Sequence, residues 1–102
     1  MREVALVTGA SSGIGLEIAK ILASQNYNLI ICARREKELL ELSNHISEKF
    51  SVDCNVVVAD LTTHEGVDLL IKESPNVDIL VNNAGFGILG EHLEMDLNRQ
   101  LE

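Results

Sequence analysis

Small and polar residues that could bind phosphate follow directly after the first apolar run of the chain. Thr8 ends this run, and the next seven residues include three glycines and two serines: Gly9, Ser11, Ser12, Gly13 and Gly15. A diphosphate needs backbone N–H groups that it can approach closely and the positive end of a helix dipole, and glycines permit both the tight turn and the close approach. The segment therefore predicts a nucleotide-binding turn between a strand and a helix. The alternative is a tight connection without a ligand.

Apolar runs typical of strands alternate with helical patterns along the chain. The predicted strands cover about 4–7, 29–32, 56–58 and 79–81. Because these runs are continuously aliphatic, the strands are expected to be covered on both faces, as in a parallel sheet. Right-handed crossovers and the dinucleotide-fold order then predict an α/β fold, a partial Rossmann-type doubly wound parallel sheet with strand order 3-2-1-4.

The predicted strand order brings two loops together. The switch point lies between the first and fourth strands, so the glycine turn and the sequence Asn82-Asn83-Ala84-Gly85 border one crevice at the carboxyl ends of the strands. Ligand binding is expected there.

The helical patterns predict which side chains face the sheet. The apolar positions are Ile14, Ile18, Ile21 and Leu22 in the first helix, Leu39, Leu42 and Ile46 in the second, over about 36–49, and Val67, Leu70 and Ile71 in the third. Thr62 or Thr63 is expected to cap the third helix.

Composition restricts the class of protein. The chain has 102 residues, enough for one small domain, and its 46% hydrophobic and 3% aromatic residues suit an aliphatic α/β core. The net charge of −8 argues against a nucleic-acid partner, because phosphate contacts need clustered Lys and Arg. Cys32 and Cys54 lack metal-binding spacing, as do the histidines, so core thiols and no metal site are expected. The sequence has no signal peptide or membrane span, which predicts a cytoplasmic protein without a membrane partner.

Three motifs together resemble those of a known family. The pattern TGxxxGxG over 8–15, Asp60 after the third strand and NNAG over 82–85 resemble the short-chain dehydrogenase/reductase family. The resemblance implies that Asp60 accepts a hydrogen bond from the adenine amino group and that the NNAG loop supports the sheet centre and lines the cofactor. The alternative for Asp60 is a solvated acid or a cap. The residues expected to bind a nicotinamide dinucleotide are Gly9, Ser11, Ser12, Gly13, Ile14, Gly15, Arg34, Arg35, Asp60, Leu61, Asn83, Ala84 and Gly85.

The end of the second predicted strand indicates which dinucleotide would bind. An NAD enzyme has a carboxylate there for the ribose 2′-hydroxyl, whereas an NADP enzyme presents a guanidinium to the 2′-phosphate. This chain has Ala33 at the position of the acid, followed by Arg34 and Arg35. NADP is therefore predicted over NAD, although Ser12 stands where the family often has a basic residue. The alternative is a solvated arginine pair at the start of a helix.

The catalytic residues of the resembled family have no counterpart in this sequence. Family members use a Tyr as general acid/base, a Lys in the pattern Y-x-x-x-K and a Ser, but the single tyrosine is Tyr27, with Ile31 at the Lys position. No catalytic residue is therefore assigned. Residues 1–102 are expected to form the N-terminal, dinucleotide-binding portion of a Rossmann domain, without the catalytic portion.

The expected function is the NADP(H)-binding half of an oxidoreductase, inactive by itself. The alternatives are a non-catalytic dinucleotide-binding module and a structural fragment that self-associates. A homo-oligomer is predicted, because strand 79–81 would have an unpaired apolar edge and a helix with Leu93, Leu97 and Leu101 would lack packing partners.

Overall fold

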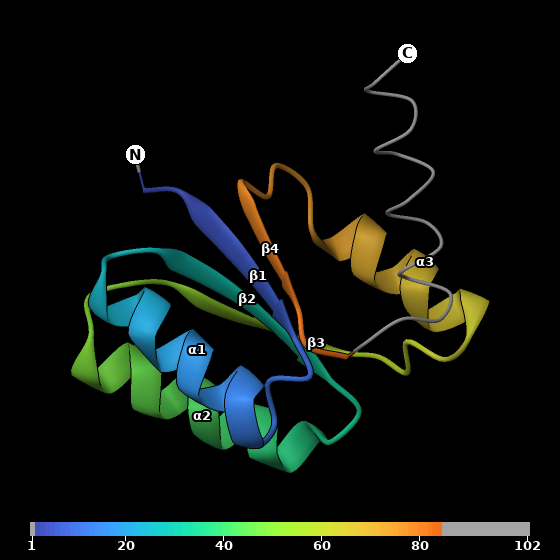
Figure 1. The fold of residues 1–102 in the computed structure, drawn as a ribbon, viewed down its shortest axis with the longest axis horizontal. Coiled ribbons are helices and arrows are strands. Elements are labelled where there is room, and N and C mark those ends of the chain that lie inside the picture. The colour runs from blue at the N-terminus through green and yellow to red at the C-terminus, as the bar shows by residue number, and fades with distance from the viewer. Residues whose placement is uncertain (1, 85–102) are drawn as a thin grey trace.

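The computed structural model describes residues 2–84, which form one parallel sheet with helices on both faces. Figure 1 shows α1 and α2 on one side of the sheet and α3 on the other. Each strand and helix predicted within these residues is present. In chain order the elements are β1 (Val4–Thr8), α1 (Gly13–Ser24), β2 (Asn28–Ala33), α2 (Glu36–Lys49), β3 (Cys54–Val58), α3 (His64–Glu73) and β4 (Ile79–Asn82).

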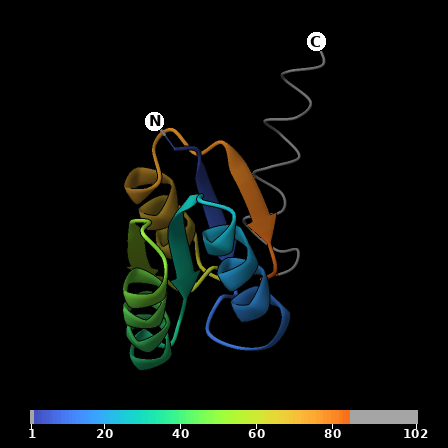
Figure 2. The same ribbon diagram turned by 90° about the vertical axis from the view of Figure 1, so that its left-hand side faces the viewer.

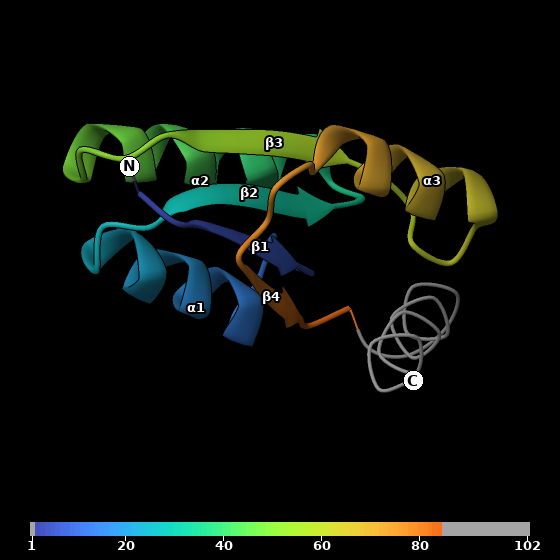
Figure 3. The ribbon, with the colours of Figure 1, turned by 90° about the horizontal axis from the view of Figure 1, so that it is seen from above.

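The strands lie in the order β3-β2-β1-β4, and every neighbouring pair is parallel. This confirms the predicted fold class and strand order. In Figures 2 and 3, β4 lies beside β1 at one edge of the sheet and β3 lies at the other. β4 is thus an edge strand of the sheet formed by the described residues, but the self-association expected from that edge stays a prediction. The helix predicted around Leu93, Leu97 and Leu101 lies outside the described residues.

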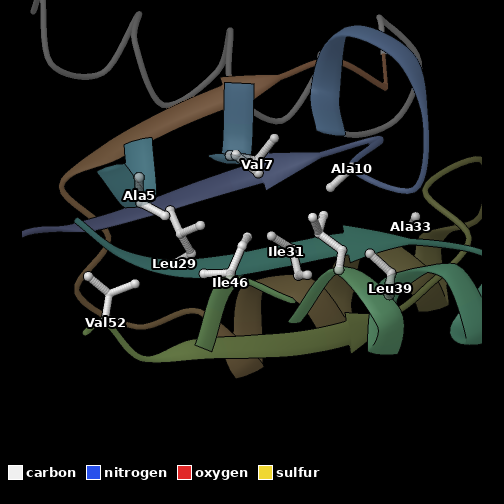
Figure 4. Packing of buried hydrophobic residues seen from close by; sticks show 12 residues of the cluster. Ala5, Val7, Ala10, Leu29, Ile31, Ala33, Leu39, Ile46 and Val52 are labelled. Carbon is white, nitrogen blue, oxygen red and sulfur yellow. The ribbon is translucent and has the colours of Figure 1, made fainter. Parts of the chain in front are cut away.

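Side chains of successive strand residues point to opposite faces and fill two cores. Val7 and Ile31 belong to the core under α1 and α2, whose packing Figure 4 shows, whereas Leu6 and Ile30 belong to the core under α3. The aliphatic runs of β1 and β2 are therefore buried on both faces, as expected for a parallel sheet. The prediction holds only in part for the edge strands, because β4 is half-buried and Val58 of β3 is 36% exposed.

The apolar faces predicted for α2 and α3 largely match the faces that pack against the sheet. In α3, Val67 and Leu70 are buried, but Ile71 is 44% exposed and does not belong to the packed face. Thr63 is the N-cap of this helix, and its Oγ1 accepts a hydrogen bond from the backbone N–H of Gly66 at 3.0 Å. In α2, the buried residues are the predicted Leu39, Leu42 and Ile46.

Only part of the apolar face predicted for α1 packs on the sheet: Leu22 packs against the buried core, and Ile18 is half-buried. Ile14 is 71% exposed and Ile21 is 55% exposed, whereas the buried residues of the helix are Gly15, Ala19 and Ala23. The start of α1 lies so close to the preceding turn that a Cβ on Gly15 would overlap a backbone carbonyl oxygen. The prediction was wrong for Ile14 and Ile21, because steric room, which hydrophobic spacing does not measure, selects the inner face.

Cys32 and Cys54 lie in the neighbouring strands β2 and β3. Cys32 of β2 is buried and Cys54 of β3 is half-buried, and both are free thiols. Burial raises the pKa of the Cys32 thiol to about 11, so this group stays protonated and unreactive at neutral pH.

Candidate functional site

The residues singled out in the sequence follow the carboxyl ends of four parallel strands. Parallel strands end at the same edge of the sheet, so these loops are neighbours, as Figure 1 shows where the four arrows end. Backbone hydrogen bonds join them: Ala10 N donates to Cys32 O at 3.2 Å, and Ala59 N donates to Ala33 O at 3.1 Å. We call this set of loops the carboxyl edge; it comprises residues 9–12, 34–35, 59–63 and 83–84.

The glycines of the turn after β1 have two roles: they adopt a left-handed backbone conformation, or they allow close packing. Gly9 and Gly13 have φ of 63° and 61°, a left-handed conformation that favours glycine. Among the described residues, apart from its chain neighbours and its own helix backbone, no atom lies within 4 Å of the position that a Cβ on Gly13 would take, so the backbone is open there. At Gly15 the opposite holds, because a Cβ would overlap the carbonyl oxygen of Gly9 and lie 2.8 Å from Asn83 Nδ2. The turn is therefore packed against the β4 loop on one side and accessible on the other.

The first turn of α1 has neither a capping side chain nor an acidic residue. Ser12 is the N-cap residue but its side chain makes no capping hydrogen bond, and the first turn contains no acidic residue. By contrast, α2 has Glu36 and Glu38 in its first turn, and α3 has the Thr63 cap and Glu65. Of the three helices described, α1 alone starts without a capping side chain or a carboxylate. The N–H groups and the positive end of its dipole suit an anion such as phosphate.

Thr8 connects the turn after β1 to the loop after β4. The side chain is fully buried, and its hydroxyl donates to Asn82 Oδ1 at 2.8 Å and accepts from Ala84 N at 3.1 Å. A third bond runs from Asn83 Nδ2 to the carbonyl oxygen of Gly9, at 3.3 Å. The role of Thr8 was missed in the sequence, where it was only the first residue of a motif. The available signal was a hydroxyl at the end of a buried strand, since buried polar groups need partners.

Asp60 lies in the loop between β3 and α3, where Thr62 and Thr63 hold it by hydrogen bonds. Its carboxylate oxygen Oδ1 accepts from Thr62 N at 2.9 Å and from Thr62 Oγ1 at 2.6 Å. Its backbone oxygen accepts from Thr63 Oγ1 at 2.9 Å, and a Cβ on Gly66 would overlap the same oxygen. The sequence indicates Thr62 only as an alternative helix cap and does not reveal its contact with the carboxylate.

Hydrogen bonding and a nearby positive charge keep Asp60 ionised. The side-chain and backbone hydrogen bonds from Thr62 lower the pKa of the Asp60 carboxyl, the positive charge of Arg34 lowers it further, and desolvation opposes both. Because the pKa is lower in the folded chain than in the unfolded one, ionised Asp60 favours folding. This contribution is complete above the unfolded pKa and is lost as the pH falls through the folded value.

The remaining predicted residues lie at the same edge with different exposure. Ser11 and Leu61 are half-buried, whereas the side chains of Ser12, Ile14, Arg34, Arg35, Asn83 and Ala84 are exposed. Hydrogen bonds unite the β1 turn with the β4 loop, and electrostatics couples Arg34 to Asp60. Gly85, also predicted to contact the cofactor, lies outside the described residues.

Over residues 2–84, His, Cys, Asp and Glu side chains do not gather in groups of three or more that could hold a metal ion. No helix of the same range is long and apolar enough to cross a membrane.

Comparison with known proteins gives concordant matches. The family model described as short chain dehydrogenase matches residues 3–102. A very-long-chain 3-oxoacyl-CoA reductase of Eremothecium gossypii is 44% identical over 86 residues, which are 79% of this chain and 24% of that protein. L-sorbose reductase from Gluconobacter frateurii, solved with NADPH and L-sorbose, has a TM-score of 0.78 and 42% identity over 84% of this chain and 34% of its own. A short-chain dehydrogenase from Sphingobium yanoikuyae in complex with NADPH has a TM-score of 0.74 and 33% identity, covering 82% of this chain and 34% of its own. The chain thus spans about a quarter to a third of the length of these proteins.

Proposed function

Since this chain belongs to the short-chain dehydrogenase family, we propose that it binds NADP(H) at its carboxyl edge and forms the cofactor-binding half of an oxidoreductase. The parent reaction would transfer a hydride between the nicotinamide and a carbonyl or alcohol carbon. The observation that carries the proposal is the turn after β1, where an open backbone at Gly13 meets the uncapped start of α1.

The residues present fit a dinucleotide. Backbone N–H groups from Ser11 to Gly15 would bind the diphosphate, because no carboxylate in the first turn of α1 competes for the helix dipole. Ionised Asp60 would accept from the adenine amino group, and the exposed loop at Asn83 and Ala84 would line the nicotinamide side of the site.

Arg34 would select NADP over NAD. Its side chain is exposed directly after β2, next to Ala33, so no carboxylate occupies the position that would bind a ribose 2′-hydroxyl. A guanidinium suits the 2′-phosphate because it offers several donors to the phosphate oxygens. Two of the similar solved structures contain NADPH, which favours the same cofactor.

The nicotinamide would supply the hydride, and the residues described would bind and orient the dinucleotide. Proton transfer needs a further group. Tyr27 is unsuited to it because it precedes β2 at the amino edge of the sheet, where it packs against the core under α1 and α2. The carboxyl edge lies at the other end of that strand.

The purified chain of 102 residues is expected to bind NADPH but not to consume it with a carbonyl substrate. Without a positioned acid or base the reaction loses a factor of about 10²–10⁴. The single tyrosine of the chain, Tyr27, has Ile31 at the Lys position of the Y-x-x-x-K pattern. NADPH absorbance followed over time with a panel of ketones and aldehydes measures this. Steady, enzyme-dependent consumption would contradict the assignment of a cofactor-binding half.

Replacing Arg34 by alanine is expected to weaken NADPH binding about ten- to a hundredfold and to leave NADH binding nearly unchanged. The reason is the loss of a charge-assisted contact to the 2′-phosphate, worth roughly 1.5–3 kcal/mol. Fluorescence titration with each cofactor measures both constants.

The matched control is Lys37→Ala, which removes an exposed positive charge from the first turn of α2. This variant should keep the NADPH affinity of the original chain within about twofold, because Lys37 lies on α2 outside the carboxyl edge and salt screens exposed charges. Equal losses for Arg34→Ala and Lys37→Ala would mean that net charge, and no specific contact, attracts the phosphate. Failure of the unchanged chain to bind either cofactor would reject the proposed function itself.

A further inference from the structure

We propose that Thr62 is a positioning residue for adenine recognition: it holds the Asp60 carboxylate by Oδ1, so that Oδ2 is presented to the exocyclic amino group of adenine. This inference rests on the proposed function and specifies how one part of the site would recognise its ligand.

Thr62 restrains the Asp60 carboxylate through one of its two oxygen atoms. Thr62 supplies two donors, its backbone N–H at 2.9 Å and its Oγ1 at 2.6 Å, and both reach the same oxygen of Asp60. Two bonds to one oxygen restrict rotation of the carboxylate before any ligand arrives. In the described part of the chain this leaves Oδ2 as the carboxylate oxygen available to a ligand donor. A group ordered in advance costs less conformational entropy on binding.

Neighbouring residues fix the backbone by separate means. The hydroxyl of Thr63 donates to Asp60 O at 2.9 Å and accepts from Gly66 N at 3.0 Å, and Gly66 packs against the same carbonyl oxygen. Thr63 is partly buried, whereas Thr62 is exposed. The loop therefore keeps its path without the Thr62 side chain, which acts on the carboxylate and not on the fold.

The charge state of Asp60 determines from which kind of group on the base it can accept a hydrogen bond. Hydrogen bonds from Thr62 lower the pKa of its carboxyl, and the Arg34 guanidinium is the charged group that adds to this effect from the end of β2. An ionised carboxylate only accepts hydrogen bonds, so it pairs with the 6-amino group of adenine and repels the 6-oxo group of hypoxanthine. The Thr62–Asp60 pair would thus discriminate an amino group from an oxo group at this position of the base.

The test compares NADPH with reduced nicotinamide hypoxanthine dinucleotide phosphate, using the 102-residue chain and its Thr62→Val and Thr62→Ser variants. The unchanged chain should prefer NADPH. In Thr62→Val the ratio of the two affinities should fall about three- to tenfold, since one of the two bonds that hold Oδ1 is lost. Thr62→Ser keeps the hydroxyl and should restore the ratio.

A pH profile of this ratio separates positioning from a structural role. Loss of the side-chain hydrogen bond raises the pKa of the Asp60 carboxyl, so the preference for NADPH should disappear at a higher pH in Thr62→Val than in the unchanged chain. At neutral pH the thermal unfolding midpoint of Thr62→Val should lie slightly below that of the unchanged chain, because the lowered pKa of Asp60 favours folding, and Thr62→Ser should match the unchanged chain.

Each other outcome has a distinct meaning. If the unchanged chain binds neither dinucleotide, the proposed function is wrong. If it binds NADPH and the hypoxanthine analogue equally, Asp60 does not read the amino group and the inference is overturned. If Thr62→Val weakens both by the same factor and markedly lowers the unfolding midpoint, Thr62 is structural and the inference is again overturned.

Discussion

Gly15→Ala is expected to destabilise the folded chain by about 3 kcal/mol, the upper end of the range for overpacking, and to remove measurable NADPH binding. The added Cβ would overlap the carbonyl oxygen of Gly9, and Asn83 Nδ2 would be 2.8 Å away. The first of these neighbours is backbone and cannot rotate away, so α1 must move off the turn. Urea unfolding measures the loss of stability, and titration with NADPH measures the loss of binding.

Gly13→Ala is the matched comparison in the same turn. In the part of the chain that the structure describes, its Cβ position has no neighbour within 4 Å beyond the adjoining residues and the helix backbone, so the variant carries only the strain of a φ of 61°. That strain costs about 1–2 kcal/mol, less than the overlap at Gly15. Equal destabilisation of the two variants, or a Gly15→Ala protein as stable as the original, would show that the close contact between α1 and the turn does not limit stability.

Thr8→Val is expected to lower the free energy of unfolding by about 3 kcal/mol although it preserves the shape of the side chain. The substitution removes the hydroxyl that donates to Asn82 Oδ1 and accepts from Ala84 N. Each hydrogen bond contributes roughly 0.5–1.5 kcal/mol, and the substitution removes two of them from a fully buried residue, so the upper end of the range applies. Urea unfolding gives the stability, and hydrogen exchange of the Ala84 amide reports directly on the broken bond.

Thr8→Ser distinguishes the contribution of the hydroxyl to stability from that of the methyl group. It keeps both hydrogen bonds and removes one buried methyl, which costs about 1 kcal/mol. The serine variant should therefore be the more stable of the two, with slow exchange at Ala84. A valine variant as stable as the serine variant would refute the role assigned to the buried hydroxyl.

The sheet could be predicted from the sequence because its signals are local. Val4–Val7 and Ile79–Val81 are continuous aliphatic runs with short connections to helical patterns, and general rules of crossover handedness then determine the strand order. Leu39 and Ile46 of α2 were found for the same reason, since hydrophobic spacing predicts the inner face of a helix that packs at ordinary distance.

Part of the inner face of α1 and two of the polar contacts could not be predicted in that way. Gly15 faces inward because of a backbone atom of the preceding turn, and no periodicity encodes that distance. Thr8 and Thr62 bond to groups whose positions depend on the folded loops. The sequence shows which residues have hydroxyls, and only the fold shows which acceptors they reach.

The hydrogen bonds of Thr8 also determine when this edge of the protein can form. Thr8 and its partners are separated by 74 and 76 residues in the chain, whereas β1, α1 and β2 are consecutive. Contacts between residues that are distant in the chain form only after the loop between them has closed. Loop closure costs conformational entropy, so such contacts slow folding. During synthesis on the ribosome, β1 and β2 can pair early, but the glycine turn gains its support from β4 only after residue 84 has emerged. Until then β1 has one unpaired edge, at which nascent chains could pair wrongly with one another.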